Sequence, residues 1–144
     1  MYYFDTSFIA PLLLTEPASG RVEAYVRKLP PGELWVSHWT RVEFASLLAR
    51  EVRTGGLKET TARETAARFE TLIEESYEVL TPRSDDYDLA REYLLHFQAG
   101  LRAGDAIHLA VAKNNGVNIL LTLDQGMLKT GRLLKLPVSL GIRE

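Results

Sequence analysis

The sequence predicts an α/β fold in which a mainly parallel central sheet is flanked by helices on both faces. Short apolar segments of strand length alternate along the chain with longer helical segments, and this alternation favours a parallel sheet covered by helices. The run NILLTL at 118–123 is nearly all apolar, which is typical of a strand buried on both faces. The length of 144 residues suits one independent core, so we expect a single domain over residues 1–144.

The N-terminal part of the chain predicts the order strand, helix, helix, strand. YYF at 2–4 is typical of a short buried strand, and the helix after it is expected to begin at Thr6 or Ser7 and to be disturbed by the proline of TSFIAPLLL. A second helix is predicted over 15–29, closed by the sequence PPG. ELWVS at 33–37 then has the length and residue types of a strand.

The next helix is predicted from Trp39 to about Arg53. Apolar residues recur along it with the spacing of one helical face. They are Trp39, Val42, Ala45, Leu48 and Val52. We expect this stripe to be buried, with Glu43 one position away from it. The glycine pair at 55 and 56 is expected to end the helix.

The rest of the chain continues the alternation. A helix rich in charges and alanine is predicted over 58–76, and YEVLTP at 77–82 predicts a short strand closed by its proline. A helix over 84–100 opens with an acidic first turn, as the helix dipole prefers. Another helix is predicted over 103–116, followed by the strand NILLTLD and by LPVSL at 136–140, the candidate last strand.

Composition excludes several classes of protein. The chain is 46% hydrophobic and 25% charged, which is ordinary for a folded protein and too apolar for a disordered one. It has no cysteine, so any metal site must use oxygen or imidazole ligands. No apolar run approaches the roughly 20 residues of a membrane span, and no secretory signal is evident, so we expect a cytoplasmic location without a membrane. The net charge of −2 excludes a bulk basic field as the source of nucleic-acid affinity.

Four carboxylates are expected at one edge of the sheet. Asp5 follows the first predicted strand and Asp124 follows NILLTL, and ligands of such sheets bind beyond the carboxyl ends of the strands. Asp105, in a first helical turn, and Glu43, early in the helix after ELWVS, reach the same edge if the strands are parallel. Four clustered carboxylates repel one another unless protons or a cation neutralise them. Mg²⁺ and Mn²⁺ prefer oxygen ligands and can activate a bound water, so the pattern indicates phosphodiester hydrolysis.

Each of these acids also has a purely structural interpretation. Asp5 and Asp124 are both placed to cap the helices that follow them. Asp105 is placed to interact with the dipole of its own helix. Glu43 could be a solvated helix residue, although its apolar neighbours Val42 and Phe44 argue against a plain exposed face.

Other polar and aromatic residues lie near the four acids. Three hydroxyl residues flank the strand-end aspartates and could bond to carboxylates or metal-bound waters; they are Thr6, Ser7 and Thr122. His108 follows Asp105 by three positions on one helix, and packing in the core is the favoured interpretation. His38 and Trp39 could stack on an unpaired base; core packing is favoured for Trp39, and both options stay open for His38.

The segments FDTSFI, RVEFASLL, LRAGDAIHLA and LLTLDQGM together resemble the four acidic motifs of the PIN-domain family, in the family's order. The resemblance covers the whole chain and is greatest to the compact ribonucleases of the VapC toxin type. It implies that Asp5, Glu43, Asp105 and Asp124 bind metal, with Thr6 and Thr122 as polar neighbours. One departure is Gly104, where a bulkier residue is common, and we expect it to loosen the Asp105 carboxylate.

The resemblance also implies an activity and partners. The protein would be a Mg²⁺- or Mn²⁺-dependent endoribonuclease, a homodimer, and the toxin of a pair whose small antitoxin protein holds it inactive. Three arginines near the motifs are candidates for contact with RNA phosphates; they are Arg41, Arg50 and Arg102. The alternative is a catalytically inactive PIN-like module that binds RNA or a protein partner. The presence of all four acids argues against it, because a structural module has no need of mutually repelling carboxylates.

Three unrelated classes fit the sequence poorly. A pepsin-like protease needs a mainly β framework and a second aspartate motif, and this chain is largely helical. A haloacid-dehalogenase phosphatase needs Asp-x-Asp after its first strand, where this chain has Ser7. A receiver-like signalling module needs an acidic pair after the first strand and an aspartate after a central one, and YEVLTP ends without an aspartate.

Overall fold

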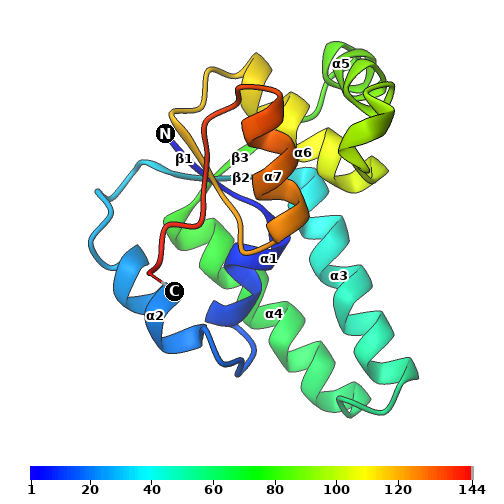
Figure 1. Cartoon of the computed structure of the whole chain (residues 1–144). Coiled ribbons are helices and arrows are strands. Elements are labelled where there is room, and N and C mark those ends of the chain that lie inside the picture. Colours follow the sequence, from blue (N-terminus) through cyan, green and yellow to red (C-terminus); the bar gives the residue numbers. More distant parts are fainter. Residues whose placement is uncertain (144) are drawn as a thin grey trace.

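The computed structural model describes residues 1–143, and it contains one five-stranded sheet surrounded by helices (Figure 1). The strands are β1 Tyr2–Phe4, β2 Leu34–Ser37, β3 Glu78–Leu80, β4 Ile119–Leu121 and β5 Val138–Ser139. The helices are α1 Thr6–Ile9, α2 Ser19–Val26, α3 His38–Arg53, α4 Glu59–Ser76, α5 Ser84–Leu94, α6 Ala103–Asn114 and α7 Gln125–Leu133, with 3-10 turns η1 at Ala10–Leu12 and η2 at Phe97–Ala99.

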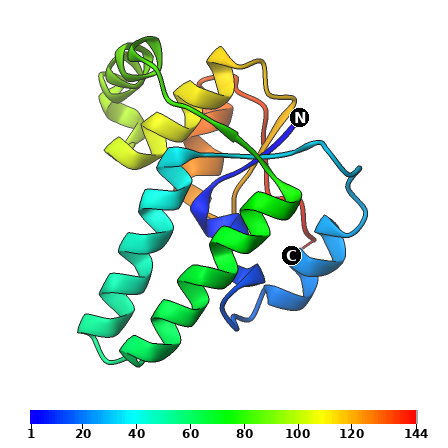
Figure 2. The ribbon, with the colours of Figure 1, turned by 180° about the vertical axis from the view of Figure 1, so that it is seen from behind.

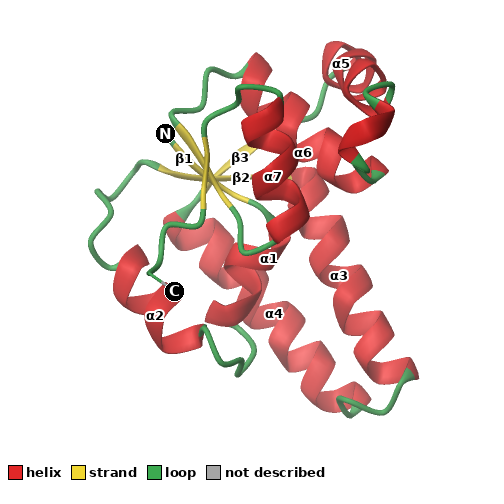
Figure 3. Ribbon diagram, in the orientation of Figure 1, coloured by secondary structure: helices red, strands yellow, loops and turns green. Residues whose placement is uncertain are grey.

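All strand pairings in residues 1–143 are parallel, and the strand order is β3-β2-β1-β4-β5. The predicted α/β class is therefore confirmed, with a sheet that is wholly rather than mainly parallel. Figure 3 shows the twisted sheet enclosed by helices. Successive residues of one strand enter different clusters of buried residues: Phe4 joins the cluster with Phe8 and Phe44, and Tyr3 joins the cluster with Leu109 and Met127. Because side chains alternate between the two faces of a strand, both faces of the sheet are covered.

Helices α3 and α4 form a long antiparallel pair that extends from the sheet (Figure 2). Phe44 of α3 stacks on Phe69 of α4 with ring centroids 4.2 Å apart. The buried residues of α3 are Thr40, Phe44 and Leu48. The predicted apolar stripe is therefore wrong in part, because Val42 is 57% exposed and Ala45 is exposed. The helix turns its Phe44 side toward α4 because burying an aromatic ring removes more apolar surface than burying the Val42 side chain.

Several predicted boundaries differ from the structure. The first helix begins at Thr6 as expected, but it becomes 3-10 at Ala10, with the proline in its first turn. The second begins at Ser19 rather than at 15. The helix predicted over 84–100 ends at Leu94, and Gly100 adopts a positive φ of 64° that ends η2. A glycine tolerates this left-handed conformation without a steric penalty.

The topology places several chain segments at the carboxyl edge of the sheet. β1 pairs with β4 in the register Phe4 to Leu121, and the Asp5 amide donates a hydrogen bond to the Leu121 carbonyl at 3.1 Å. Helix α3 starts directly after β2 at the same edge. This edge is therefore where residues from β1, β4 and α3 meet. Within the described chain, no helix combines the length and the apolar character that crossing a bilayer requires.

Candidate active site

A cavity of about 450 Å³ lies at the carboxyl edge of the sheet, and all four predicted acids line it: Asp5, Glu43, Asp105 and Asp124. They come from four separate parts of the chain, namely the end of β1, helix α3, the first turn of α6 and the start of α7. Three arginines line the same cavity: Arg50, Arg53 and Arg102. The parallel topology therefore brings the four carboxylates together, as expected from their places in the sequence.

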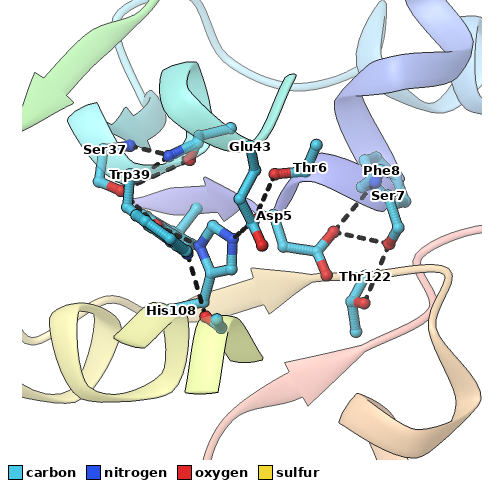
Figure 4. A network of polar contacts seen from close by, with 12 residues as sticks. Asp5, Thr6, Ser7, Phe8, Ser37, Trp39, Glu43, His108 and Thr122 are labelled. Atoms are coloured by element: carbon cyan, nitrogen blue, oxygen red, sulfur yellow. Dashed lines mark hydrogen bonds and ion pairs between the residues drawn. The ribbon is translucent and has the colours of Figure 1, made fainter. Parts of the chain in front are cut away.

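Asp5 is both a helix cap and a cavity residue. Its Oδ1 accepts hydrogen bonds from the Phe8 amide at 3.0 Å and from the Ser7 hydroxyl at 2.7 Å (Figure 4). The residue is only 3% exposed. Burial raises the pKa of Asp5, and His108 and hydrogen bonds with Thr122, Ser7 and Phe8 partly offset the rise. The interpretation of Asp5 as a helix cap is compatible with its interpretation as a metal ligand, because the two hydrogen bonds from Phe8 and Ser7 both end on Oδ1.

Asp124 caps α7 in the same way. Its Oδ1 accepts from the Met127 amide at 2.9 Å. The backbone before it is held by two hydroxyls, since Thr122 Oγ1 accepts from the Asp124 amide at 3.0 Å and Ser7 Oγ accepts from the Leu123 amide at 2.9 Å. The Ser7 and Thr122 hydroxyls are themselves 3.2 Å apart. These hydroxyls thus join the end of β1 to the end of β4, and they fix both strand-end aspartates.

Asp105 lies in the first turn of α6 and is partly buried. Burial, together with the charges of Asp124 and Asp5, raises its pKa to about 6, against smaller opposing effects of His108 and Arg102. The arginine offers little compensation, because Arg102 Nη2 is 4.0 Å from Asp124 and its side chain is 84% exposed. Arg102 therefore does not offset the repulsion of Asp105 by Asp124 and Asp5.

Glu43 differs from the three aspartates because its carboxylate is well compensated. Its Oε1 accepts a hydrogen bond from Thr6 Oγ1 at 2.7 Å and is in close contact with Nε2 of His108. Burial alone would raise the pKa of Glu43, but the hydrogen bond and charge of His108, with the Thr6 bond, hold it below its ordinary value. The Glu43 carboxylate is thus favoured in its ionised form.

Helical spacing explains which arginines reach the cavity. Arg50 and Arg53 lie 7 and 10 positions after Glu43 on α3. In a helix of 3.6 residues per turn, this spacing places all three residues on one face. Arg53 was missed, although this spacing could have identified it. Arg41, the third candidate for contact with RNA phosphates, does not line the cavity, and its Nε donates to Glu70 of α4 at 3.0 and 3.1 Å.

The aromatic residues near the site also differ from expectation. Trp39 is only partly buried, lines the cavity, and donates from Nε1 to the Gly104 carbonyl at 3.2 Å, so simple core packing is wrong for it. His38 is exposed, and its Nδ1 is 2.9 Å from Arg41 Nη1. His108 is buried, as expected, but it also bonds to Glu43. The spacing of three positions from Asp105 indicated a place beside the same pocket, but it did not indicate the bond to Glu43.

Gly104 has a steric role that its place in the motif did not reveal. A Cβ atom at this position would lie 2.7 Å from Oε2 of Glu43 and 3.4 Å from Cζ2 of Trp39, which is closer than side chains tolerate without movement. The glycine therefore lets the first turn of α6 approach the Glu43 carboxylate, and that approach gives a reason for the absence of a bulkier residue.

The donor set fits a hard divalent cation that keeps part of its water shell. Within residues 1–143, no three acidic or histidine side chains lie close enough together to form a ready metal cage. Mg²⁺ commonly retains several waters and binds only one or two carboxylates directly, so carboxylates that line one cavity without forming a closed cage suit it. Burial raises the pKa of Asp105 most, and the charges of Asp124 and Asp5 raise it further; a bound cation would neutralise these charges.

Comparison with known proteins agrees with this arrangement. The family model described as PIN domain matches residues 2–133. No curated protein sequence matches the chain. Similar solved structures include the sarcin–ricin loop cleaving toxin VapC20 of Mycobacterium tuberculosis, with a TM-score of 0.74 and 22% identity over 91% of this chain and 95% of that one.

Two further structures share the fold across nearly their whole length. FitAcB from Neisseria gonorrhoeae has a TM-score of 0.69 and 20% identity, and VapBC-1 from nontypeable Haemophilus influenzae has a TM-score of 0.68 and 18% identity. Each alignment covers 96% of this chain and 96% of the other. The match of the family model over most of the chain shows the family, and this chain belongs to the PIN domain family.

Proposed function

We propose that this protein is a metal-dependent endoribonuclease, formed by a single nuclease domain over residues 1–144, and the toxin of a toxin–antitoxin pair. The observation that carries the proposal is the meeting of Asp5, Glu43, Asp105 and Asp124 around one cavity at the edge of a parallel sheet. An inactive binding module of the same fold would gain nothing from four acids that repel one another.

The residues divide into distinct roles. Asp5, Asp105 and Asp124 would hold Mg²⁺ or Mn²⁺, which supplies a Lewis acid and an activated water for attack on a phosphodiester. Glu43, favoured in its ionised form by His108 and Thr6, would accept a hydrogen bond from the attacking water and orient it, or hold a second metal ion. Ser7 and Thr122 would hold the strand-end aspartates in place through the bonds between β1 and β4.

The proposed substrate is RNA with unpaired bases in a single strand or a loop. Sequence-specific proteins reach RNA bases most readily where they are unstacked. VapC20, similar at 22% identity, is described as cleaving the sarcin–ricin loop, which supports an RNA loop as the substrate class.

The test of the proposal is whether cleavage depends on a divalent cation. Wild-type protein incubated with total cellular RNA should produce discrete cleavage products in Mg²⁺ or Mn²⁺, and EDTA should stop their formation until excess metal is added back. Mapping of the new RNA ends would identify the cleaved sequence. Products that form at the same rate in EDTA would contradict the proposal, and binding of RNA without any cleavage would favour the inactive module.

Arg50 and Arg53 are expected to contact RNA phosphates, since both line the cavity from the same helix. The double variant Arg50→Gln/Arg53→Gln should bind RNA more weakly. The magnitude of the slope of log affinity against log salt should fall by about 1 to 2, because binding releases fewer counterions when phosphate contacts are lost. Arg102 is exposed at the rim and should contribute less. Arg41→Gln is the matched control, because Arg41 pairs with Glu70 away from the cavity. An unchanged slope in the double variant would exclude this role.

We also propose a homodimer that binds a small antitoxin in the cytoplasm. Structures with the same fold include VapBC-1 and a FitAB complex bound to a DNA fragment, which supports a partner protein of this kind. Symmetric dimers are the commonest assembly of small soluble chains. This part of the proposal would be contradicted by three results together. Light scattering would show a monomer, no small protein would be recovered with the chain from its native cells, and fractionation would show no cytoplasmic pool.

A further inference from the structure

A chain of buried hydrogen bonds links the core of the sheet to Glu43 (Figure 4). The Tyr3 hydroxyl lies 2.8 Å from Ser37 Oγ and 2.7 Å from Nδ1 of His108, and Nε2 of His108 is in close contact with Oε1 of Glu43. Tyr3 and Ser37 are fully buried, and His108 is 1% exposed. The residues come from β1, β2, α6 and α3, so the chain ties four elements together.

The chemistry of these groups fixes the direction of the bond between His108 and Glu43. An ionised carboxylate can only accept, so Nε2 of His108 must donate to Glu43. If the imidazole is protonated, Nδ1 donates to the Tyr3 oxygen and the Tyr3 hydroxyl donates to Ser37 Oγ; if it is neutral, Nδ1 is the acceptor, and the Tyr3 hydroxyl donates to it. In the neutral form the Tyr3 oxygen in turn accepts from the Ser37 hydroxyl. Every donor in the chain has an acceptor, and rotation of the imidazole would leave buried polar groups unpaired.

Glu43 is also held from its other sides. Its Oε1 accepts a second hydrogen bond, from Thr6 Oγ1 at 2.7 Å, so this oxygen is fully occupied by protein groups. A Cβ atom added to Gly104 would lie only 2.7 Å from the other oxygen of Glu43, Oε2. Trp39 Nε1 donates to the Gly104 carbonyl at 3.2 Å, which holds α6 at this distance. Only Oε2 is left for a water or a metal ion in the cavity.

We propose that Tyr3 and His108 are positioning residues that act through Glu43, by fixing its carboxylate so that Oε2 alone serves the reaction. Tyr3 is fully buried and would not touch the substrate, and His108, which lines the cavity but is only 1% exposed, would act through Glu43. The inference rests on the proposed nuclease function, and it assigns to the tyrosine of the first strand a role beyond packing. A misplacement of a catalytic group by about 1 Å can cost about 10²-fold in rate, so small shifts of Glu43 would be visible in turnover.

Kinetics of four variants test the positioning role. The probe is a random-sequence single-stranded oligoribonucleotide with a fluorophore and a quencher, in saturating Mn²⁺. Tyr3→Phe, which removes only the hydroxyl, and Gly104→Ala, which moves Glu43 by steric contact, should each lower kcat by about 10- to 100-fold with KM within about twofold. His108→Leu should lower kcat at least as much, and His108→Gln, which keeps a donor, should recover part of the loss.

Matched controls separate positioning from damage to the fold. Tyr77→Phe also removes a buried tyrosine hydroxyl, but this hydroxyl has no hydrogen-bond partner within residues 1–143. Gly20→Ala adds a methyl group to another helix where nothing lies within 4 Å. Both should retain wild-type kcat. In a Glu43→Ala background, Tyr3→Phe should cause no further fall in kcat, because the group that it positions is gone. An equal fractional fall in both backgrounds, or wild-type kcat in Tyr3→Phe, would overturn the proposal.

A second measurement does not require activity. The chain has three histidines, and His38 and His96 are exposed, so an imidazole N–H protected from solvent exchange in the nitrogen-15 NMR spectrum belongs to His108. We expect such a signal in the wild type, a shift of it in Tyr3→Phe, its loss in Glu43→Ala and no change in Tyr77→Phe. Absence of the signal from folded wild-type protein would overturn the inference. A signal that behaves as expected in a protein that cleaves no RNA would instead overturn the proposed function and leave the positioning of Glu43 standing.

Discussion

Asp5→Asn is expected to lower the rate of RNA cleavage by about 10³-fold or more at any Mg²⁺ or Mn²⁺ concentration. Loss of a metal-binding charge removes several kcal/mol of stabilisation from the transition state, and each 1.4 kcal/mol is about tenfold in rate. The variant is nearly ideal because asparagine keeps the shape of the side chain. It also keeps an acceptor for the Phe8 amide and the Ser7 hydroxyl, and asparagine caps helices about as well as aspartate.

The fold of Asp5→Asn should therefore survive while the activity is lost. The measurement is single-turnover cleavage of the mapped RNA site, with thermal unfolding followed in parallel. Asp86→Asn is the control, because Asp86 is equally buried and accepts from the Arg83 amide near the start of α5, far from the four acids in the sequence and outside the cavity lining. Asp86→Asn should keep its activity below its melting temperature. Residual activity above about a tenth of wild type in Asp5→Asn would exclude a primary metal-binding role for Asp5.

The sheet and its active edge were predictable because they depend on local patterns. YYF and NILLTL are apolar enough that only strands buried on both faces accommodate them. Each is followed by a group of residues that can cap a helix, so Asp5 and Asp124 had to lie at strand ends. Once the strands are parallel, their carboxyl ends share one edge. The cavity that contains both aspartates follows from these two steps.

Contacts between distant segments were not predictable in the same way. The face of α3 that enters the core depends on Phe69 of α4, which stacks on Phe44, and the spacing of apolar residues within α3 alone favoured the wrong stripe. The partners of His108 lie on β1 and α3, and nothing in DAIHLA identifies them. The close approach behind Gly104 likewise requires knowledge of where Glu43 and Trp39 lie. Such features arise from tertiary packing, which overrides local preference.

Asp105→Asn is expected to raise the melting temperature of the metal-free protein at pH 7. The pKa of Asp105 is raised from 3.8 in the unfolded chain to about 6 in the folded one, through burial and the charges of Asp124 and Asp5. Well below pH 3.8 the carboxyl group is protonated in both states and costs nothing. The cost grows as the pH rises toward 6 and is fully present above that value. At pH 7 it is on the order of 1 to 2 kcal/mol, after allowance for the screening of a partly exposed group by solvent.

Asparagine removes this cost because it has nearly the same shape and no charge. The melting temperature should rise by roughly 3 to 6 °C at pH 7, and the difference should shrink as the pH falls and disappear at about pH 3. Added Mn²⁺ should reverse the order, since a ligand at 100 times its Kd stabilises the wild type by about 2.7 kcal/mol and the variant much less. The measurement is thermal unfolding in EDTA and in Mn²⁺ across this pH range.

Asp85→Asn provides the matched comparison, because Asp85 also lies in the first turn of a helix but is exposed. An aspartate there gains from the helix dipole, so its removal should lower the melting temperature slightly or leave it unchanged. If Asp105 were only such a dipole partner, Asp105→Asn would behave like Asp85→Asn, melting no higher than wild type in EDTA and gaining as much from Mn²⁺. Opposite shifts of the melting temperature in the two variants would instead mean that repulsion among the cavity acids outweighs the favourable interaction of Asp105 with its helix dipole. Under that condition a bound cation stabilises the fold.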